Sequence, residues 1–411
     1  LRSRLEKNRG KFEMVEKVLI FGESVIKKTR QDKTEFYDES ITGFARTTNS
    51  IAFKLADMGY DVDIADYGLP DGLISVVTPF TQKAVVKVHG IRSDNDGYRD
   101  LGRYKLPKLL KIIKPGLLIL IGDLRMYSYV VDIPNVPYTV AVLPVDGSPV
   151  PNTWLPILDK FDEIVSVSEF GMNELKKVGI NSTLIPFGVD TNIYHPLSED
   201  TISELKKTAE DLPVDKWIWG AVMRNQPRKN LPDLFLAFKK FDEIYPDKSI
   251  LYVHSYPEDE IGWDLFELAR YYRIATKVRF TKQFFDVSQP ILNSIYNVAD
   301  VNITATCSEG FGLTTLESMA TGTPQIAPAH TAIAELVSPN CGELVKVERN
   351  IMGTALVNEY LVSIDDFVDK MVRMYENPGL RDWYARNALE KAKKYSWDSI
   401  IPKWVKLLEG F

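Results

Sequence analysis

The sequence has few of the residues that build disulfide frameworks and metal centres. It contains two cysteines, Cys307 and Cys341, and four histidines among 411 residues. The cysteines have no CxxC spacing and the histidines are scattered, so they form neither a disulfide framework nor a metal-binding pattern. The pairs Asp61-Val62-Asp63 and Asp94-Asn95-Asp96 resemble metal-binding aspartates, but neither has a matching third ligand. We expect no metal site, and a reducing, intracellular setting.

The sequence also lacks an excess of positive charge and long apolar runs. Its net charge of −6 argues against a protein that binds nucleic acid through electrostatics. The longest apolar run, 117–121, is far shorter than the roughly 20 residues of a membrane-spanning helix. No stretch has the pattern of a signal peptide. We therefore expect a cytoplasmic, globular protein without a nucleic-acid partner.

What the sequence does contain is an alternation of strand and helix signals, given twice. A chain of 411 residues exceeds what one hydrophobic core usually supports. Alternating strands and helices are typical of doubly wound parallel sheets. We predict an α/β protein with two Rossmann-like domains facing each other across a cleft, over residues 1–195 and 196–390. A C-terminal helical segment, 391–411, is expected to pack back on the first domain.

The segment 307–324 is the most informative part of the chain. It joins two apolar strand signals through a glycine-bearing loop, Gly310-Phe311-Gly312, and a short helix. A strand, a glycine loop and a helix N-terminus together form a site for anions. Glu309 and Glu317 flank it, which suits a ligand with phosphates and hydroxyls. The pair Thr314 and Glu317 also fits a capping box, so a structural explanation of Glu317 is about as good as a functional one.

A second cluster of charge follows the predicted strand 217–222. Arg224 and Lys229 lie between that strand and the next helix. Two fixed cations there can hold a diphosphate and stabilise the charge that grows on it as a leaving group. A solvated basic turn is the alternative. Because the same half of the chain carries Glu309 on the same side of the sheet, the functional interpretation is favoured.

Four further features give weaker signals. Gly43 opens a Gly-Phe-Ala-Arg-Thr-Thr stretch that departs from GxGxxG, so it is weak evidence for phosphate binding. Asp146 follows a strand and can orient an acceptor hydroxyl or accept its proton, or else is a turn aspartate. His254 ends a strand on the ligand side, although a structural role is the commoner one. The basic stretch 103–114 is typical of a helix packed on a sheet, and less often of a membrane-surface contact.

At this point the residues resemble a known family, the retaining GT-B glycosyltransferases of family four, also called group 1. The signature is Glu309-x7-Glu317 within Ser-Glu-Gly-Phe-Gly-Leu-Thr-Thr-Leu-Glu-Ser-Met-Ala-Thr-Gly-Thr-Pro. Arg224 and Lys229 have that family's arginine-to-lysine spacing. The segments 165–169, 185–196 and 395–397 also have counterparts in that family, and the resemblance is looser before Thr139.

This resemblance implies that the C-terminal domain binds a nucleotide-sugar and the N-terminal domain an acceptor, which is a glycan, a lipid-linked molecule or a small molecule. Glu317 would hold the ribose and Glu309 the donor sugar. Arg224 and Lys229 would hold the diphosphate in place of a metal, with no cofactor. The loop from Gly310 would offer backbone N–H groups from Phe311, Gly312, Leu313 and Thr314, and His254 would lie near the donor.

Two departures from the family concern the acceptor side. The family's double glycine appears as Gly43-Phe44 after a polar stretch, 23–42, and its cleft histidine is replaced by the turn that contains Asp146. We expect a retaining, metal-independent hexosyltransferase that transfers a sugar to an acceptor hydroxyl. A nucleotide-sugar epimerase or hydrolase of the same fold, and a catalytically silent nucleotide-sugar-binding protein, are the alternatives.

Overall fold

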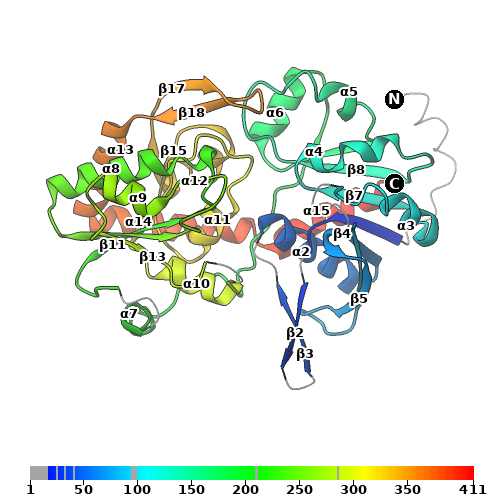
Figure 1. Cartoon of the computed structure of the whole chain (residues 1–411), viewed down its shortest axis with the longest axis horizontal. Coiled ribbons are helices and arrows are strands. Elements are labelled where there is room, and N and C mark those ends of the chain that lie inside the picture. Colours follow the sequence, from blue (N-terminus) through cyan, green and yellow to red (C-terminus); the bar gives the residue numbers. More distant parts are fainter. Residues whose placement is uncertain are drawn as a thin grey trace. The chain divides into compact units, whose positions relative to one another are not determined.

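The computed structural model describes residues 17–24, 26–31, 34–39, 42–93, 100–208, 212–284 and 287–411. The pair Asp94 and Asp96 therefore lies outside the described residues. The chain divides into two compact units (Figure 1). The first takes in the chain up to Val145, Val150–Gly188 and Trp397–Phe411, and the second takes in Asp146–Pro149 and Val189–Ser396. The sequence prediction had placed the boundaries after residues 195 and 390.

The first unit is built on an eight-stranded sheet in the order β10-β9-β8-β7-β1-β4-β6-β5. All neighbouring strands are parallel except β5, which runs antiparallel to β6. The central strand β7 reads Leu-Leu-Ile-Leu-Ile and is buried throughout, as expected for a parallel strand covered on both faces. The strands are β1 (Lys17–Gly22), β4 (Asp61–Pro70), β5 (Gly72–Val77), β6 (Val85–Arg92), β7 (Leu117–Ile121), β8 (Tyr138–Leu143), β9 (Glu163–Ser166) and β10 (Thr183–Leu184).

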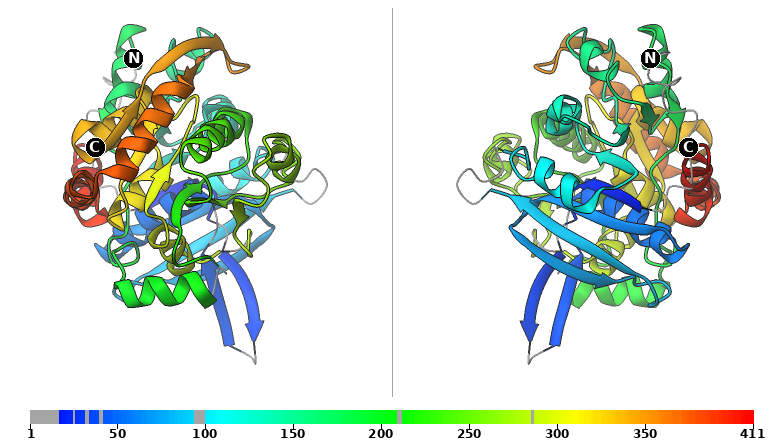
Figure 2. Two further views of the ribbon diagram at one scale, coloured as in Figure 1. Left: turned by 90° about the vertical axis from the view of Figure 1, so that its left-hand side faces the viewer. Right: turned by 90° about the vertical axis from the view of Figure 1, so that its right-hand side faces the viewer.

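Helices connect these strands, and an antiparallel ribbon is inserted between β1 and the first described helix. The ribbon, β2 (Ile26–Gln31) with β3 (Thr34–Glu39), extends away from the sheet (Figures 1 and 2). The last helix packs on α2, where Lys54 and Asp398 form an ion pair. The helices are α2 (Gly43–Asp57), α3 (Leu106–Ile113), α4 (Leu124–Tyr127), η2 (Ser128–Asp132), α5 (Leu155–Leu158), α6 (Glu169–Lys177) and α15 (Trp397–Glu409).

The second unit has a six-stranded, fully parallel sheet in the order β13-β12-β11-β14-β15-β16. Its chain order reverses between β11 and β14, and open α/β sheets bind ligands at such a point, beyond the carboxyl ends of the strands. The strands are β11 (Trp217–Val222), β12 (Ser249–His254), β13 (Val278–Phe280), β14 (Val301–Ile303), β15 (Gln325–Pro328) and β16 (Gly342–Val345), with a separate hairpin of β17 (Val347–Met352) and β18 (Asn358–Val362).

The core of this unit is an aromatic cluster in which α8 and α13 pack on the sheet. Trp219 of β11 and Phe241 of α8 meet edge to face, and Phe367 of α13 is fully buried in the same cluster. The helices are α7 (Glu199–Thr208), η3 (Pro227–Lys229), α8 (Leu231–Ile244), α9 (Leu265–Tyr271), α10 (Gln289–Asn297), α11 (Leu313–Ala320), α12 (Thr331–Cys341), α13 (Ile364–Glu376) and α14 (Pro378–Lys394). In the described part of the chain, no helix is both long and apolar enough to cross a membrane.

Candidate functional site

The first half of the candidate site is the short turn η3 after β11. Pro227 opens the turn, and its fixed φ suits the first position of a helical segment. Asn230 ends it in the left-handed conformation, with φ of 50°, and α8 then starts at Leu231. Arg228 and Lys229 are thus presented from one rigid turn at the carboxyl end of a central strand.

The second half is the loop that follows β14, and main-chain hydrogen bonds fasten it to η3. The backbone N–H of Cys307 donates to the carbonyl oxygen of Arg228 at 2.7 Å. The hydroxyl of Thr306 donates to the same oxygen at 3.2 Å. Since both bonds involve the backbone of Arg228, the spacing between the two loops is set independently of the charged side chains.

Helix α11 starts directly after this loop, at a glycine. Gly312 has φ of +100° and caps the helix without a side-chain hydrogen bond, a conformation that a residue with a Cβ adopts only under strain. Among the described residues, the N-cap position therefore offers no side-chain hydrogen bond to the first turn. Free N–H groups and the positive end of the helix dipole favour an anion at this position.

The predicted capping box is wrong. The helix starts at Leu313, so Thr314 lies inside its first turn and caps nothing. The carboxylate of Glu317 instead accepts a hydrogen bond from the hydroxyl of Tyr296, at 2.8 Å. The left-handed turn at Gly312 takes the place of a threonine cap. The structural role of Glu317 is therefore not to cap the helix. Its buried carboxylate instead bonds to Tyr296 on α10.

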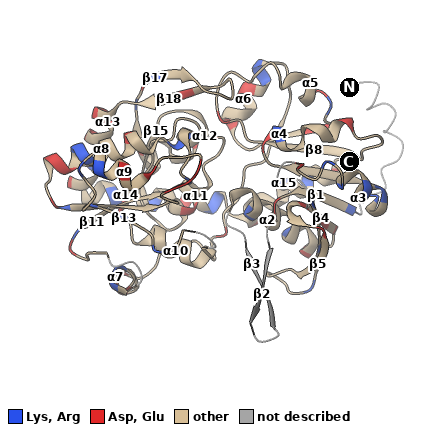
Figure 3. Ribbon diagram, viewed as in Figure 1, with Lys and Arg blue, Asp and Glu red and all other residues tan. Residues whose placement is uncertain are grey.

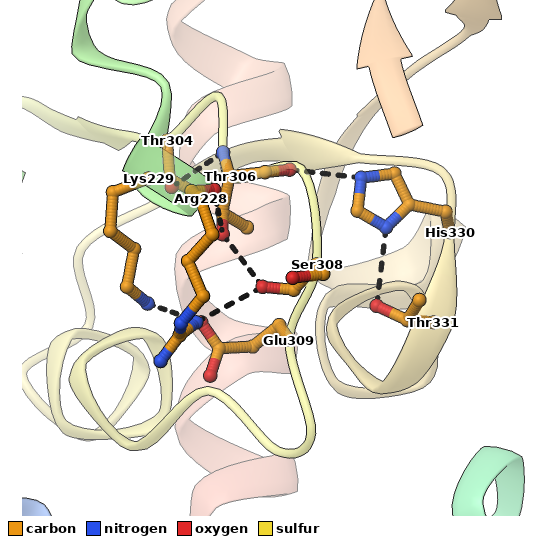
Figure 4. A network of polar contacts seen from close by, with 8 residues as sticks. All are labelled: Arg228, Lys229, Thr304, Thr306, Ser308, Glu309, His330 and Thr331. Carbon is orange, nitrogen blue, oxygen red and sulfur yellow. Dashed lines mark hydrogen bonds and ion pairs between the residues drawn. The ribbon is translucent and has the colours of Figure 1, made fainter. Parts of the chain in front are cut away.

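The charged centre of the site is the carboxylate of Glu309, on which two cations converge (Figure 4). Lys229 Nζ forms a short ion pair with Glu309 Oε2. Arg228 Nη1 lies 3.4 Å from the same oxygen and donates to the carbonyl oxygen of Ser308 at 3.1 Å. The side chains of Lys229 and Glu309 are each 13% exposed, and that of Arg228 is 32% exposed. The cluster carries two positive charges and one negative charge.

These three groups shift one another's proton affinity. Burial acts to raise the pKa of Glu309, but the charges and hydrogen bonds of Lys229 and Arg228 outweigh it, so the pKa is lowered and the carboxylate is ionised. Burial lowers the pKa of Lys229, and repulsion from Arg228 lowers it further, while Glu309 only partly offsets both. The protonated form of Lys229 is therefore destabilised in the free protein, and a bound anion would stabilise it.

A buried histidine supports the loop from the side away from the cations. His330 Nε2 lies 2.9 Å from the carbonyl oxygen of Thr306 (Figure 4). The ring of His330 also stacks on that of Tyr360 in β18. Burial lowers the pKa of His330 to about 4, so the imidazole is neutral at physiological pH and Nε2–H donates to that carbonyl. The backbone N–H of Tyr360 donates to the carbonyl oxygen of Cys307 at 2.8 Å. Together these contacts fix the loop that carries Glu309.

The structure gives Arg224 a different ion-pair partner from that of Lys229. The Arg224 side chain is 61% exposed, and its Nε donates to Asp259 at 3.1 Å. It lies two residues beyond the end of β11. The neighbour that shares Glu309 with Lys229 is Arg228. A role for Arg224 on the diphosphate stays a prediction.

The other predicted residues lie at strand and helix ends. His254 ends β12 and its Nδ1 lies 2.9 Å from the hydroxyl of Thr281, which is a structural contact. Asp146 belongs by its contacts to the second unit, and its charge acts to raise the pKa of Lys229. Gly43 is the first residue of α2 in the first unit. Their ligand contacts stay predictions.

The discounted aspartate pair is accounted for by ion pairs in the first unit. Lys17 Nζ lies 3.0 Å from Asp61 and 3.7 Å from Asp63, and His89 Nε2 lies 3.1 Å from Asp63. Within the described ranges, no group of three or more His, Cys, Asp or Glu side chains is placed to hold a metal ion. A cavity of 440 Å³ does occur in the second unit, but between α7 and the turns before β14 and β15, and no residue of the Glu309 cluster lines it.

Sequence reasoning missed three residues of this site. Arg228 adjoins Lys229 in the chain, but only the geometry of η3 shows that both reach Glu309. Asp259 and His330 come from loops whose sequences carry no recognisable motif. A proline before an Arg-Lys pair at the end of a strand was the one available signal for Arg228.

Comparison with known proteins adds to this geometry. Residues 218–377 match the family model described as "Glycosyl transferases group 1". The matched range contains η3, the Glu309 loop and α11. The second unit is a group 1 glycosyltransferase domain. The resemblance read from the sequence is confirmed over this range.

Curated proteins that resemble this chain match it over part of its length. Trehalose synthase of Thermococcus litoralis is 26% identical over 274 residues, which are 62% of this chain and 59% of that protein. D-inositol 3-phosphate glycosyltransferase of Salinispora tropica is 29% identical over 227 residues, 52% of this chain and 43% of that protein. The chain thus spans about two fifths to three fifths of the length of these relatives.

Solved structures show that the fold extends beyond the group 1 domain. Sucrose-phosphate synthase from Thermosynechococcus elongatus has a TM-score of 0.74 at 17% identity, covering 96% of this chain and 98% of that chain. Anabaena HepE, solved in complex with UDP and glucose, has a TM-score of 0.71 at 16% identity, covering 97% and 100%. The expected GT-B fold is confirmed.

Proposed function

We propose that this chain is a retaining glycosyltransferase that moves a sugar from a nucleoside-diphosphate sugar to an acceptor hydroxyl without a metal ion. The observation that carries the proposal is the Glu309 cluster. A buried carboxylate and two cations lie beside the start of α11, where no side chain caps the helix. This arrangement combines an anion site with a hydroxyl acceptor, the two features that a sugar diphosphate requires.

Each part of the donor has a candidate partner in this proposal. The diphosphate binds Lys229, Arg224 and the N–H groups of Phe311 to Thr314. The carboxylate of Glu317 faces the ribose hydroxyls, and that of Glu309 faces the sugar. Fixed positive charge at the diphosphate stabilises the leaving group as its bond to the sugar breaks, which is the task that a metal ion performs in other transferases.

Retention of configuration follows if the acceptor attacks from the side on which the diphosphate leaves. The bond from the anomeric carbon to the diphosphate oxygen breaks, and a bond from that carbon to the acceptor oxygen forms. The proton of the acceptor hydroxyl passes to the departing diphosphate oxygen, so this route needs no protein base. Asp146 is the candidate for orienting the acceptor hydroxyl.

The choice of substrates to test first follows from the relatives. HepE was solved with UDP and glucose, and other relatives are named for trehalose and inositol 3-phosphate. UDP-glucose is therefore the first donor to test, followed by GDP- and ADP-sugars. Acceptors to test are a small polyol or sugar, a glycan and a lipid-linked sugar.

The direct test incubates the protein with each labelled nucleotide-sugar, with and without acceptor, in excess EDTA. We expect slow release of diphosphate alone, faster release with an acceptor, and a product with the donor's anomeric configuration by NMR. EDTA should leave the rate within about twofold, since the fixed cations are proposed to replace a metal. Release without transfer to any acceptor indicates a hydrolase, a changed sugar indicates an epimerase, and binding without turnover indicates a silent binder.

We further propose that the first unit contacts an anionic membrane surface through α3. Residues 103–114 contain five basic and no acidic residues, in a chain of net charge −6 (Figure 3). Ile112 of α3 is 77% exposed, and Lys108 and Lys111 of the same helix are exposed as well. Tyr104, just before the helix, is 62% exposed. Basic residues around exposed apolar side chains suit the interface of an anionic bilayer.

The membrane contact is testable by sedimentation with vesicles. Vesicles of phosphatidylcholine with 30% phosphatidylglycerol should bind the protein about tenfold more tightly than pure phosphatidylcholine, since each basic residue near the surface contributes ~1 kcal/mol. The double variant Lys108→Gln, Lys111→Gln should lose that preference. Lys393→Gln, an exposed lysine of α14, is the matched control. Equal sedimentation with both kinds of vesicle contradicts the proposal.

A further inference from the structure

The two cations at Glu309 differ in how they are held. Lys229 meets the carboxylate through a single short contact at the end of a flexible side chain. The Arg228 guanidinium is anchored to the carbonyl oxygen of Ser308 at 3.1 Å, and its backbone carbonyl is bonded to Cys307 and Thr306. Arg228 is thus tied at both ends to the loop that carries Glu309, whereas Lys229 can leave it.

The two cations contact only one of the two carboxylate oxygens of Glu309. Both contacts fall on Oε2 of Glu309. Among the described residues none forms a hydrogen bond to Oε1, and the side chain is not fully buried. A ligand hydroxyl can therefore donate to Oε1 without displacing either cation. The two contacts at Oε2 fix the orientation of the carboxylate.

An arriving diphosphate competes with Glu309 for one of these cations. A lysine is a compact charge on a mobile stem, whereas Arg228 Nη1 already contacts both the carbonyl oxygen of Ser308 and Glu309 Oε2. We therefore expect the diphosphate to take Lys229 and Arg228 to remain with Ser308 and Glu309. The distance of 3.4 Å between Arg228 Nη1 and Glu309 Oε2 is long for a hydrogen bond, and we expect it to shorten once Lys229 no longer shares that oxygen.

We propose that Arg228 is a positioning residue that keeps the Glu309 carboxylate directed at the donor sugar when the diphosphate takes Lys229. This inference rests on the proposed function and adds a division of labour within it. Lys229 binds the diphosphate, Glu309 binds the sugar, and Arg228 acts on the substrate only through Glu309.

Calorimetric titration of Arg228→Gln with nucleotides and nucleotide-sugars tests this division. The probes are UDP, GDP and ADP, each compared with its glucose ester. In the wild type the nucleotide-sugar should bind more tightly than the free nucleotide. Arg228→Gln should reduce this gain in affinity by about tenfold, the effect of one charge-assisted hydrogen bond. Its affinity for the free nucleotide should change less than about threefold, because the diphosphate contact belongs to Lys229.

The pH profile of turnover gives a readout that a purely structural role would not move. The charge of Arg228 holds the pKa of Glu309 down. Turnover that needs ionised Glu309 is lost as pH falls through that pKa, so Arg228→Gln should shift the acid limb to higher pH. Arg228→Lys keeps the charge and should restore the acid limb and part of the sugar's contribution. If the glutamine variant does not fold, Arg228→Lys alone tests the proposal. It should lose part of the affinity that the sugar adds and keep the wild-type acid limb.

A matched control is Arg373→Gln, since Arg373 pairs with another buried glutamate of the same unit, Glu343, at 3.3 Å. Arg373→Gln should leave unchanged both the affinity that the sugar adds and the acid limb of the pH profile of turnover. Equal loss of nucleotide and nucleotide-sugar affinity in Arg228→Gln makes Arg228 a phosphate ligand and overturns the inference. So does an unchanged sugar contribution. A wild type that binds no nucleotide overturns the proposed function as well, and so is a distinct result.

Discussion

Replacing Glu309 with glutamine is expected to lower turnover on the order of a hundredfold while nucleoside diphosphate binds more tightly. The carboxylate that we propose to face the sugar is lost, and removal of one such preorganised group commonly costs a factor of that order. At the same time Lys229 loses the partner that competes with the diphosphate. We expect an affinity gain of about tenfold, equivalent to ~1.4 kcal/mol. Steady-state kinetics and calorimetry on the same variant measure the two effects.

The same variant should be less stable without ligand, because Lys229 and Arg228 then lie together without the counter-charge of Glu309. A nucleoside diphosphate should restore that stability, so the ligand-induced rise in melting temperature exceeds the wild type's. The control is Glu343→Gln, a buried, ion-paired glutamate of the same unit outside the site. Weaker diphosphate binding in Glu309→Gln contradicts the assignment of Glu309 to the sugar.

The second large effect is expected for Lys229→Gln, which should weaken nucleoside diphosphate binding on the order of a hundredfold, as expected when a largely buried charged partner is removed. Turnover at low donor concentration should fall at least as much. Lys277→Gln, in which another ion-paired lysine of the same unit is replaced, is the matched control. Nucleotide binding that survives in Lys229→Gln places the diphosphate elsewhere.

The pH dependence of binding follows from the same lysine. In the free protein, burial and Arg228 hold the pKa of Lys229 below 10.5, and a bound diphosphate raises it. Binding therefore takes up a proton at high pH. Nucleotide affinity should be full below the free-protein pKa of Lys229 and fall as pH rises through it. Calorimetry across the alkaline range measures this fall, which should be absent in Lys229→Gln.

Much of the fold was predictable because the strands are short, apolar and separated by strong helix signals. The strand and helix on either side of the Glu309 loop, and the place of Lys229 after β11, followed from such local patterns. The strand β5 and the hairpin of β17 and β18 were not predicted, since their residues are partly exposed and carry no regular alternation. Their position depends on partners distant in the chain.

The side-chain contacts within the site were less predictable than the location of the site. A Thr-x-x-Glu pattern indicated a capping box at Thr314, but the left-handed Gly312 already starts the helix. Glu317 then bonds to Tyr296, 21 residues away. Likewise, the spacing of Arg224 and Lys229 could not reveal that Arg228 is the residue beside Glu309. Such contacts depend on where a turn aims its side chains, which spacing along the chain does not specify.

The central claim is that the second unit binds a nucleoside diphosphate through the Glu309 cluster. The most direct measurement is the melting temperature of the wild-type chain with UDP, GDP and ADP, each alone and as its sugar ester. We predict that at least one nucleotide raises the melting temperature in proportion to its occupancy, and that Lys229→Gln removes the rise. Unchanged melting with every nucleotide and every nucleotide-sugar would contradict the account.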